Sequence, residues 1–322
     1  MSQPRSVEDA AKNGDLPLLQ SLHAANSLPL TATLSYNAAA GGHQHILSWL
    51  RSISCPWDEH TCTLAAKGGH IGVLKWLRQE GCPWDKWTCS YAAQGGHLGV
   101  LTWAYENGCP LDTYICDYAA IGGHIHILIW LREKGCDWDE HTCKLAAEEG
   151  HLHFLQYVRR LSCPWYSDIC DDAARGGHIH VLSWLREMGC SWDELTCVSA
   201  ADGGHLSVLQ WLIREGCPWD ERTCVMAAER RHLSVLVWAL KNGCPCYTTN
   251  YMPITCLKHY NDIVWLLDYT QHGSHETHLY HFDVQITDVV KEWTHVIHAT
   301  CDMLNDSHIL ISDIVDLIKS FI

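Results

Sequence analysis

The chain has 322 residues, of which 47% are hydrophobic, and its formal net charge at pH 7 is −15. This acidic surplus argues against a protein that binds nucleic-acid phosphates or docks on an anionic membrane. The apolar fraction is ample for a continuous core, and 23 glycines and 10 prolines are too few for a disordered or collagen-like chain.

The first residues carry Glu8, Asp9 and Asp15 and lack the apolar run of a signal peptide. No stretch reaches the roughly 18 apolar residues that a membrane-spanning helix needs. We therefore expect a cytoplasmic protein. In that reducing compartment, the 18 cysteines are expected to be free thiols and not a disulfide framework.

Cysteine and histidine recur with a step of 27 residues through most of the chain. The first cysteine series is Cys55, Cys82, Cys109, Cys136, Cys163, Cys190, Cys217 and Cys244. The second is Cys62, Cys89, Cys116, Cys143, Cys170, Cys197 and Cys224. The histidines are His43, His70, His97, His124, His151, His178, His205, His232 and His259. Three series in one register indicate a repeat architecture.

One unit, residues 55–81, reads CPWDEHTCTLAAKGGHIGVLKWLRQEG and predicts two short helices. Asp58 is a good N-cap for the first, whose small residues allow close approach of a neighbouring helix. The glycine pair Gly68-Gly69 ends that helix. The second helix has a broad apolar face and ends at Gly81. Because helices this short cannot bury their apolar faces alone, the units must stack on one another.

The stretch AAKGGHIGVLKWLRQEG resembles the ankyrin repeat pattern, and the match recurs along the chain. The resemblance implies an all-α, ankyrin-like solenoid of about ten helix pairs, which work as a protein-binding module. The unit is shorter than the ankyrin repeat of about 33 residues, so short loops should replace the usual β-hairpins. This Cys- and Trp-rich short form is similar to ankyrin-like arrays of large DNA viruses and some protists, which would place the protein in a host cytoplasm.

The array is expected to cover residues 1–273, with degenerate end units at 1–30 and 244–273. Residues 274–322 are predicted to be a linker followed by a C-terminal helical hairpin that caps the stack. The apolar stripe of the hairpin includes Val289, Trp293 and Ile297, and Asn305-Asp306-Ser307 forms its turn.

No sequence signature of an enzyme is present, so we expect neither catalysis nor a cofactor. Zinc is the alternative reading of the cysteine and histidine series, but six residues separate the paired cysteines where zinc sites have two to four. The better reading is structural: small buried thiols, and histidines that bond backbone at the turn between helices. The recurring tryptophans are expected to pack. The cluster His272, His275, His278 and His281 is read as a solvated linker and not as a metal site.

Positions that differ between units are candidates for recognition, because packing does not dictate them. They form a stripe on the first helix of each unit, on the side that the resemblance places on the inner, concave curve. One predicted site is an aromatic cluster of Trp87, Tyr91, Tyr114, Tyr118 and Ile121. A second is an acidic patch of Asp168, Asp171 and Asp172. Further candidates on the stripe are Asp117, His141, Lys144 and Arg175. The alternative is ordinary surface variation with partial burial between units.

The predicted function is a non-enzymatic scaffold or adaptor that binds a partner protein on the concave face. The alternative is a substrate receptor of a cullin-RING ubiquitin ligase, since LISDIVDLIKSFI at the end resembles the first helix of an F-box. Its adaptor-binding residues would be Leu310, Ile314, Leu317, Ile318 and Phe321. The usual proline after the first leucine is replaced by Ile311, and a plain capping helix explains the same pattern.

Overall fold

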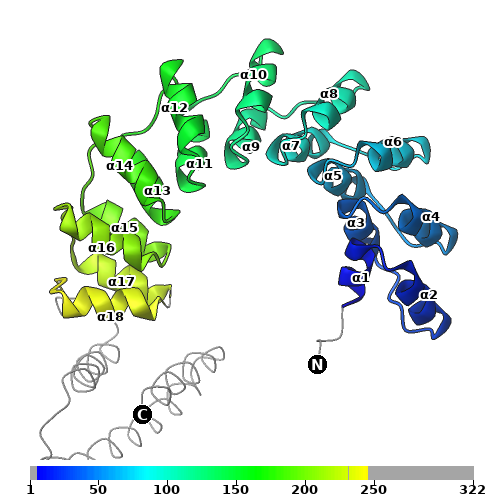
Figure 1. The fold of residues 1–322 in the computed structure, drawn as a ribbon, viewed down its shortest axis with the longest axis horizontal. Helices are drawn as coiled ribbons and strands as arrows, with labels where there is room; N and C mark the ends of the chain where they lie inside the picture. Colours follow the sequence, from blue (N-terminus) through cyan, green and yellow to red (C-terminus); the bar gives the residue numbers. More distant parts are fainter. Residues whose placement is uncertain (1–5, 231, 246–322) are drawn as a thin grey trace, which may run out of the picture. The chain divides into compact units, whose positions relative to one another are not determined.

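The computed structural model describes residues 6–230 and 232–245, and all regular structure in them is helical (Figure 1). The first half of the array contains α1 (Val7–Asn13), α2 (Leu16–Ala24), α3 (Ala32–Ala40), α4 (Gln44–Ser52), α5 (Glu59–Lys67), α6 (Ile71–Gln79), α7 (Lys86–Gln94), α8 (Leu98–Glu106), α9 (Ile115–Ile121) and α10 (Ile125–Glu133). The second half contains α11 (Glu140–Glu148), α12 (Leu152–Arg160), α13 (Ile169–Arg175), α14 (Ile179–Glu187), α15 (Glu194–Asp202), α16 (Leu206–Arg214), α17 (Glu221–Glu229) and α18 (Leu233–Lys241).

The predicted all-α stack of helix pairs with short loops is confirmed for these residues. The described part of the chain holds nine of the expected ten pairs. The degenerate last unit, the histidine cluster at 272–281 and the C-terminal segment with Leu310 and Phe321 lie outside the described residues. None of the described helices is long and apolar enough to cross a membrane.

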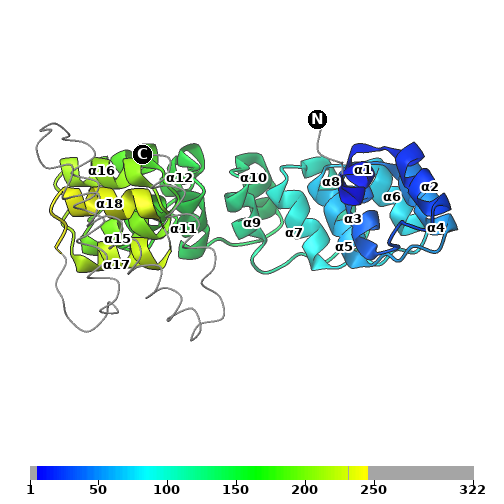
Figure 2. The same ribbon diagram turned by 90° about the horizontal axis from the view of Figure 1, so that it is seen from below.

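The helices form two layers (Figures 1 and 2). Odd-numbered helices pack on one another in what we call the first-helix layer, and each even-numbered helix folds back to form the second-helix layer. Cys62, Ala65 and Ala66 of α5 are completely buried, and their equivalents in the other units are buried as well. Because these side chains are small, successive first helices can approach closely.

Most first helices begin at an aspartate cap. The Asp58 side chain accepts a hydrogen bond from the backbone N–H of His60, and the Asp58 backbone N–H donates to the Thr61 hydroxyl oxygen. The same reciprocal capping box occurs at Asp139 and at Asp193. The cap therefore fixes where each link ends and each helix starts.

Two first helices start later than predicted, because buried isoleucine replaces the threonine of the capping box. α9 begins at Ile115 and α13 at Ile169, so each has seven residues where the others have nine. An isoleucine has no hydroxyl with which to bond the cap. Tyr114 and Asp168, expected on first helices, are consequently the N-cap residues that precede them.

The histidine series bonds backbone, as predicted, but across to the preceding unit. His70 Nε2 lies 3.0 Å from the carbonyl oxygen of Ala40, and His124 Nε2 lies 3.0 Å from that of Gln94. The glycines of the turn permit this contact. A Cβ on Gly95 would lie 2.4 Å from the carbonyl oxygen of Lys67 in the preceding unit. The turn of each unit is thus tied directly to the backbone of its neighbour.

Tryptophan pairs hold the second-helix layer together. In five units the tryptophan of the link meets the tryptophan of the following second helix at 5.7 to 5.9 Å between ring centroids. An arginine often covers the link ring, as when Arg159 lies 4.1 Å from the centroid of Trp165. The tryptophans therefore pack, as the sequence predicted.

The half-buried histidines of the turns should make the array sensitive to acid. Burial is the main reason that the pKa of His124 is lowered from its ordinary 6.5, with the neighbouring His126, His151 and His97 adding to the effect. The pKa of His178 is lowered for the same reason. A group with a lowered pKa contributes stability above its unfolded pKa and loses it as the pH falls through the folded pKa.

We predict that His124→Gln, whose amide can still donate to the Gln94 carbonyl, is less stable than the natural chain near pH 7.5. The difference should shrink below about pH 6.5, because only the natural chain then has to protonate a buried imidazole. Urea midpoints across this pH range measure the difference, and His178→Gln should behave alike. A deficit that stays constant with pH would refute the explanation.

Candidate functional site

Three rings of the predicted aromatic cluster lie together on neighbouring first helices. The ring centroid of Tyr118 on α9 lies 5.9 Å from that of Trp87 and 5.8 Å from that of Tyr91, both on α7. The chain's own cations cover two of the rings: Lys67 Nζ lies 5.1 Å from the Tyr91 centroid, and Lys86 Nζ lies 4.9 Å from that of Trp87. The cluster thus joins two units with a mixed aromatic and basic surface.

The five side chains of the predicted aromatic cluster differ in exposure. Tyr114 is 63% exposed and Trp87 is 40% exposed, whereas Tyr91, Tyr118 and Ile121 are half-buried. Burial, with the nearby Tyr91 and acidic groups, raises the pKa of Tyr118. Tyr118 is therefore part of the packing between units, and Tyr114 and Trp87 are the residues that a partner could contact most fully.

An ion pair fixes the backbone beside Tyr114. Lys86 Nζ lies 2.7 Å from the buried Asp112 Oδ2, and Asp112 Oδ1 accepts the backbone N–H of Tyr114 at 2.9 Å. Burial alone would raise the pKa of Asp112, but the hydrogen bonds from Lys86 and Tyr114 outweigh it and lower that pKa. The buried carboxylate of Asp112 thus fixes the backbone of Tyr114, while the Tyr114 side chain stays exposed.

Asp117 and Asp171 serve the contact between units. Asp117 is buried, which contradicts the expectation that it lies exposed on the stripe. Its Oδ1 accepts the Thr142 hydroxyl of the next first helix at 2.6 Å, and His141 Nδ1 lies 3.1 Å from its Oδ2. The half-buried Asp171 accepts the Thr196 hydroxyl at 2.6 Å in the same way. These carboxylates already have partners within the array.

The predicted acidic patch is wrong as an exposed surface of carboxylates. Asp172 is 6% exposed and lies 3.8 Å from both Lys144 Nζ and Arg175 Nη1. Arg175 Nε continues to Asp202 at 3.1 Å, and Arg230 Nε reaches the same carboxylate at 2.6 Å. Only Asp168 is exposed. Asp172 and Asp202 thus form an ion-pair network with Lys144, Arg175 and Arg230 that links successive units.

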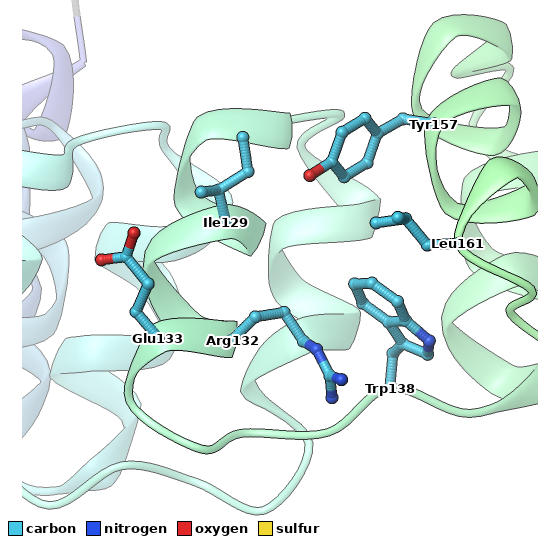
Figure 3. A pocket seen from close by; sticks show the side chains of 6 residues that line it. All are labelled: Ile129, Arg132, Glu133, Trp138, Tyr157 and Leu161. Atoms are coloured by element: carbon cyan, nitrogen blue, oxygen red, sulfur yellow. The ribbon is translucent and has the colours of Figure 1, made fainter.

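The second-helix layer carries a groove that the sequence did not predict (Figure 3). It has a volume of about 490 Å³ and is lined by Ile129, Arg132, Glu133, Trp138, Tyr157 and Leu161. Ile129 is 41% exposed and Leu161 is 50% exposed. Figure 3 shows Tyr157 and Trp138 on its walls, and no ring contact joins these two described residues.

The groove lies where the tryptophan pairs are interrupted. Tyr157 stands at the position of the second-helix tryptophan, and Leu111 replaces the link tryptophan of the preceding unit. At the same boundary Glu149 stands where most units have the first glycine of the turn. These substitutions, read against the repeat, are the sequence signal that could have located the groove.

No group of three or more metal-binding side chains occurs within residues 6–230 and 232–245. The cysteines among those residues are thiols, and the histidine rings bond backbone as described above. The candidate that remains is the surface that includes Trp87 and Tyr114.

The buried carboxylate of Asp172 should cost the fold stability at neutral pH. Burial raises its pKa to about 6, against the opposing charges of Lys144 and Arg175. A group with a raised pKa contributes stability below its unfolded pKa, and that contribution is lost as the pH rises through about 6. We predict that Asp172→Asn stabilises the array by about 1 to 2 kcal/mol near pH 7.5.

The gain from Asp172→Asn should disappear as the pH falls from about 6 towards 3.8, the ordinary value, because the natural carboxyl is then neutral as well. Urea unfolding at several pH values measures it. Asp168→Asn, at the exposed N-terminus of the same helix, is the control and should change stability by less than about 0.5 kcal/mol. A destabilised Asp172→Asn chain would show that the ion pairs outweigh burial.

At the groove, restoring the missing tryptophan should stabilise the array. Tyr157→Trp restores the ring that meets the link tryptophan in five other units, so we expect a gain of about 0.5 to 1.5 kcal/mol in the free energy of unfolding. The matched reverse substitution, Trp184→Tyr, breaks the pair of Trp165 and Trp184 at 5.8 Å and should destabilise. Urea midpoints compare the two. If Tyr157→Trp destabilises, the boundary is shaped for tyrosine.

Comparisons with known proteins add a likeness of fold. No protein-family model matches the chain, and no curated protein matches it. Among solved structures the chain is similar to the ankyrin repeat domain of human ASB11, with 18% sequence identity and a TM-score of 0.38. The match covers 49% of this chain and 84% of that domain. This likeness concerns helical repeats alone and does not identify what the chain binds.

Proposed function

We propose that this protein is a non-enzymatic scaffold that binds another protein through the surface of its first-helix layer, the concave face of the ankyrin resemblance. The observation that carries the proposal is the pair Trp87 and Tyr114, large aromatic side chains that are 40% and 63% exposed beside a packed aromatic support. Exposed aromatics on a rigid base are the usual composition of an interface hot spot.

The fold does not require aromatic residues at these positions. Trp87 and Tyr114 occupy the same position of neighbouring units, and the other units have His60, His141, Asp168, Leu195 and Arg222 there. Below the exposed rings, Tyr118 contacts both Trp87 and Tyr91, so the surface is held in place before a partner arrives. A preformed surface loses less conformational entropy on binding.

The charges around the cluster favour a partner segment with an apolar anchor. Lys67 and Lys86 flank the rings, and the second of these is already paired with Asp112. A net charge of −15 makes nucleic acid or an anionic membrane a poor partner. The ubiquitin-ligase alternative depends on Leu310 to Phe321, outside the described residues, and stays a prediction, as do the cytoplasmic location and the viral resemblance.

The test uses Tyr114→Ala and not a change of Tyr118, because Tyr118 packs between units. A random-peptide display library is selected on the full natural chain, and enriched peptides are titrated against each variant. We expect Tyr114→Ala to weaken them by about 2 kcal/mol or more, roughly thirtyfold, with an unchanged melting temperature. Tyr166, which is 48% exposed in another unit, gives the matched control Tyr166→Ala.

Peptides that bind Tyr114→Ala as tightly as the natural chain would place the binding surface elsewhere. Equal losses in Tyr114→Ala and Tyr166→Ala would likewise contradict the proposal, because the effect would then belong to any exposed tyrosine. A Trp87→Ala variant that melts normally and also loses the peptides would add support.

A further inference from the structure

Within the repeat, the two cysteine series meet in pairs. The cysteine of a first helix and the cysteine of the following link are 20 residues apart, and in one pair Cys143 Sγ donates to Cys163 Sγ at 3.1 Å. The same spacing pairs Cys62 with Cys82, Cys89 with Cys109, and Cys197 with Cys217, and in each pair the link thiol is the largest cause of the raised pKa of the first-helix thiol. All eight side chains are buried.

The aspartate cap sets the position of the link thiol. Cys82 Sγ donates to the carbonyl oxygen of Asp58 at 3.3 Å, the cap of the helix that carries Cys62. The corresponding distance from Cys109 to Asp85 is 3.1 Å, and from Cys217 to Asp193 it is 3.4 Å. A carbonyl that holds one sulfur beside another makes the approach of the two thiols a regular feature of the unit.

The cysteine pairs of α9 and α13 differ from these four and provide an internal control. Their pairs are Cys116 with Cys136 and Cys170 with Cys190, for which only an interaction through space is present and no hydrogen bond. These are the units whose first helices begin late, at Ile115 and Ile169. Cys136 and Cys190 are also partly exposed, unlike the link cysteines of the other pairs.

In two of the pairs the thiols of the link and of the first helix have pKa values that are shifted in opposite directions. The hydrogen bond from Cys62 lowers the pKa of Cys82, and that from Cys89 lowers the pKa of Cys109. The partner thiols Cys62 and Cys89 have raised pKa values for the same reason. In these two pairs the link thiol is therefore the one more readily ionised, and the thiolate is the form that reacts with oxidants.

We propose that the pairs Cys62–Cys82, Cys89–Cys109, Cys143–Cys163 and Cys197–Cys217 are sites of reversible disulfide formation with a peroxide as the oxidant. The link thiolate attacks one peroxide oxygen, and the O–O bond breaks to leave a sulfenic acid and, after protonation, one water. The first-helix thiol then attacks the sulfenic sulfur and displaces a second water. Two thiols and one peroxide thereby give one disulfide and two waters.

The geometry requires only a small movement. A separation of 3.1 Å between sulfurs must close by about 1 Å to reach a disulfide bond. Peroxide is little larger than water, and local opening of a link between units is enough to admit it. Each bridge would join a first helix to the link that follows its own helix pair. The free thiols expected under reducing conditions and these bridges are two states of the same pairs.

The test treats the reduced full chain with hydrogen peroxide, blocks remaining thiols with N-ethylmaleimide and maps peptides by mass spectrometry without reduction. We expect four cross-linked peptides, one for each contacting pair, each lacking the mass of two hydrogen atoms. Cys136 and Cys190 should carry the blocking group. The urea midpoint should rise after oxidation and return on treatment with dithiothreitol, because a bridge restricts the unfolded chain.

Cys163→Ala should abolish the Cys143–Cys163 peptide and reduce the oxidation-induced rise in midpoint, whereas Cys190→Ala should change neither. Cys143→Ala gives the same test if the first variant does not fold. Four pairs that remain thiols while Cys136 and Cys190 are oxidised would overturn the proposal. Bridges between other cysteines, or a rise in midpoint that Cys163→Ala leaves intact, would overturn it as well.

Discussion

The stacking of this array depends on how closely the turn of one unit approaches the backbone of the unit before it. At Gly95 there is no room for a Cβ beside the Lys67 carbonyl, and the histidine of the turn bonds the preceding backbone. The completely buried alanines of the first helices allow the same short separation. Each unit of 27 residues is therefore positioned by backbone contacts that any sequence with these small residues would make.

These backbone contacts explain why so much of the fold could be predicted from the sequence. The aspartate caps, glycine turns and apolar second helices recur with the repeat, so one unit predicts the others. The late starts of α9 and α13 could have been found too, since Ile115 and Ile169 interrupt a series of threonines. Which side chains of the variable stripe are buried could not be predicted from the sequence. A repeat shows which residues are constant, but not which neighbours each variable residue contacts.

Asp117 shows the physical reason. A position that differs between units can be free of packing, or it can vary together with a residue of the next unit. The Thr142 hydroxyl bonds Asp117, 25 residues before it, and the Thr88 hydroxyl lies 3.5 Å from that of Thr63. The residue 25 positions before Thr223 is Val198, which has no polar group, and the buried Thr223 hydroxyl has no hydrogen-bond partner in the described residues. The relevant pattern is thus a pairing between units. Tyr114 and Trp87 are the exposed aromatic residues of the described stripe.

The interruption at Tyr157 and Glu149 has a mechanical consequence. In a linear array each unit is stabilised only by its neighbours, so the chain is as cooperative as its weakest interface. Between α9–α10 and α11–α12 the tryptophan pair is missing and a bulky residue occupies a glycine position of the turn. A pulling force applied to the two ends would therefore divide the array here first, into two blocks that each keep their internal stacking. The same boundary adjoins the aromatic surface on α9, so a partner bound to both sides of the boundary would hold the two blocks together.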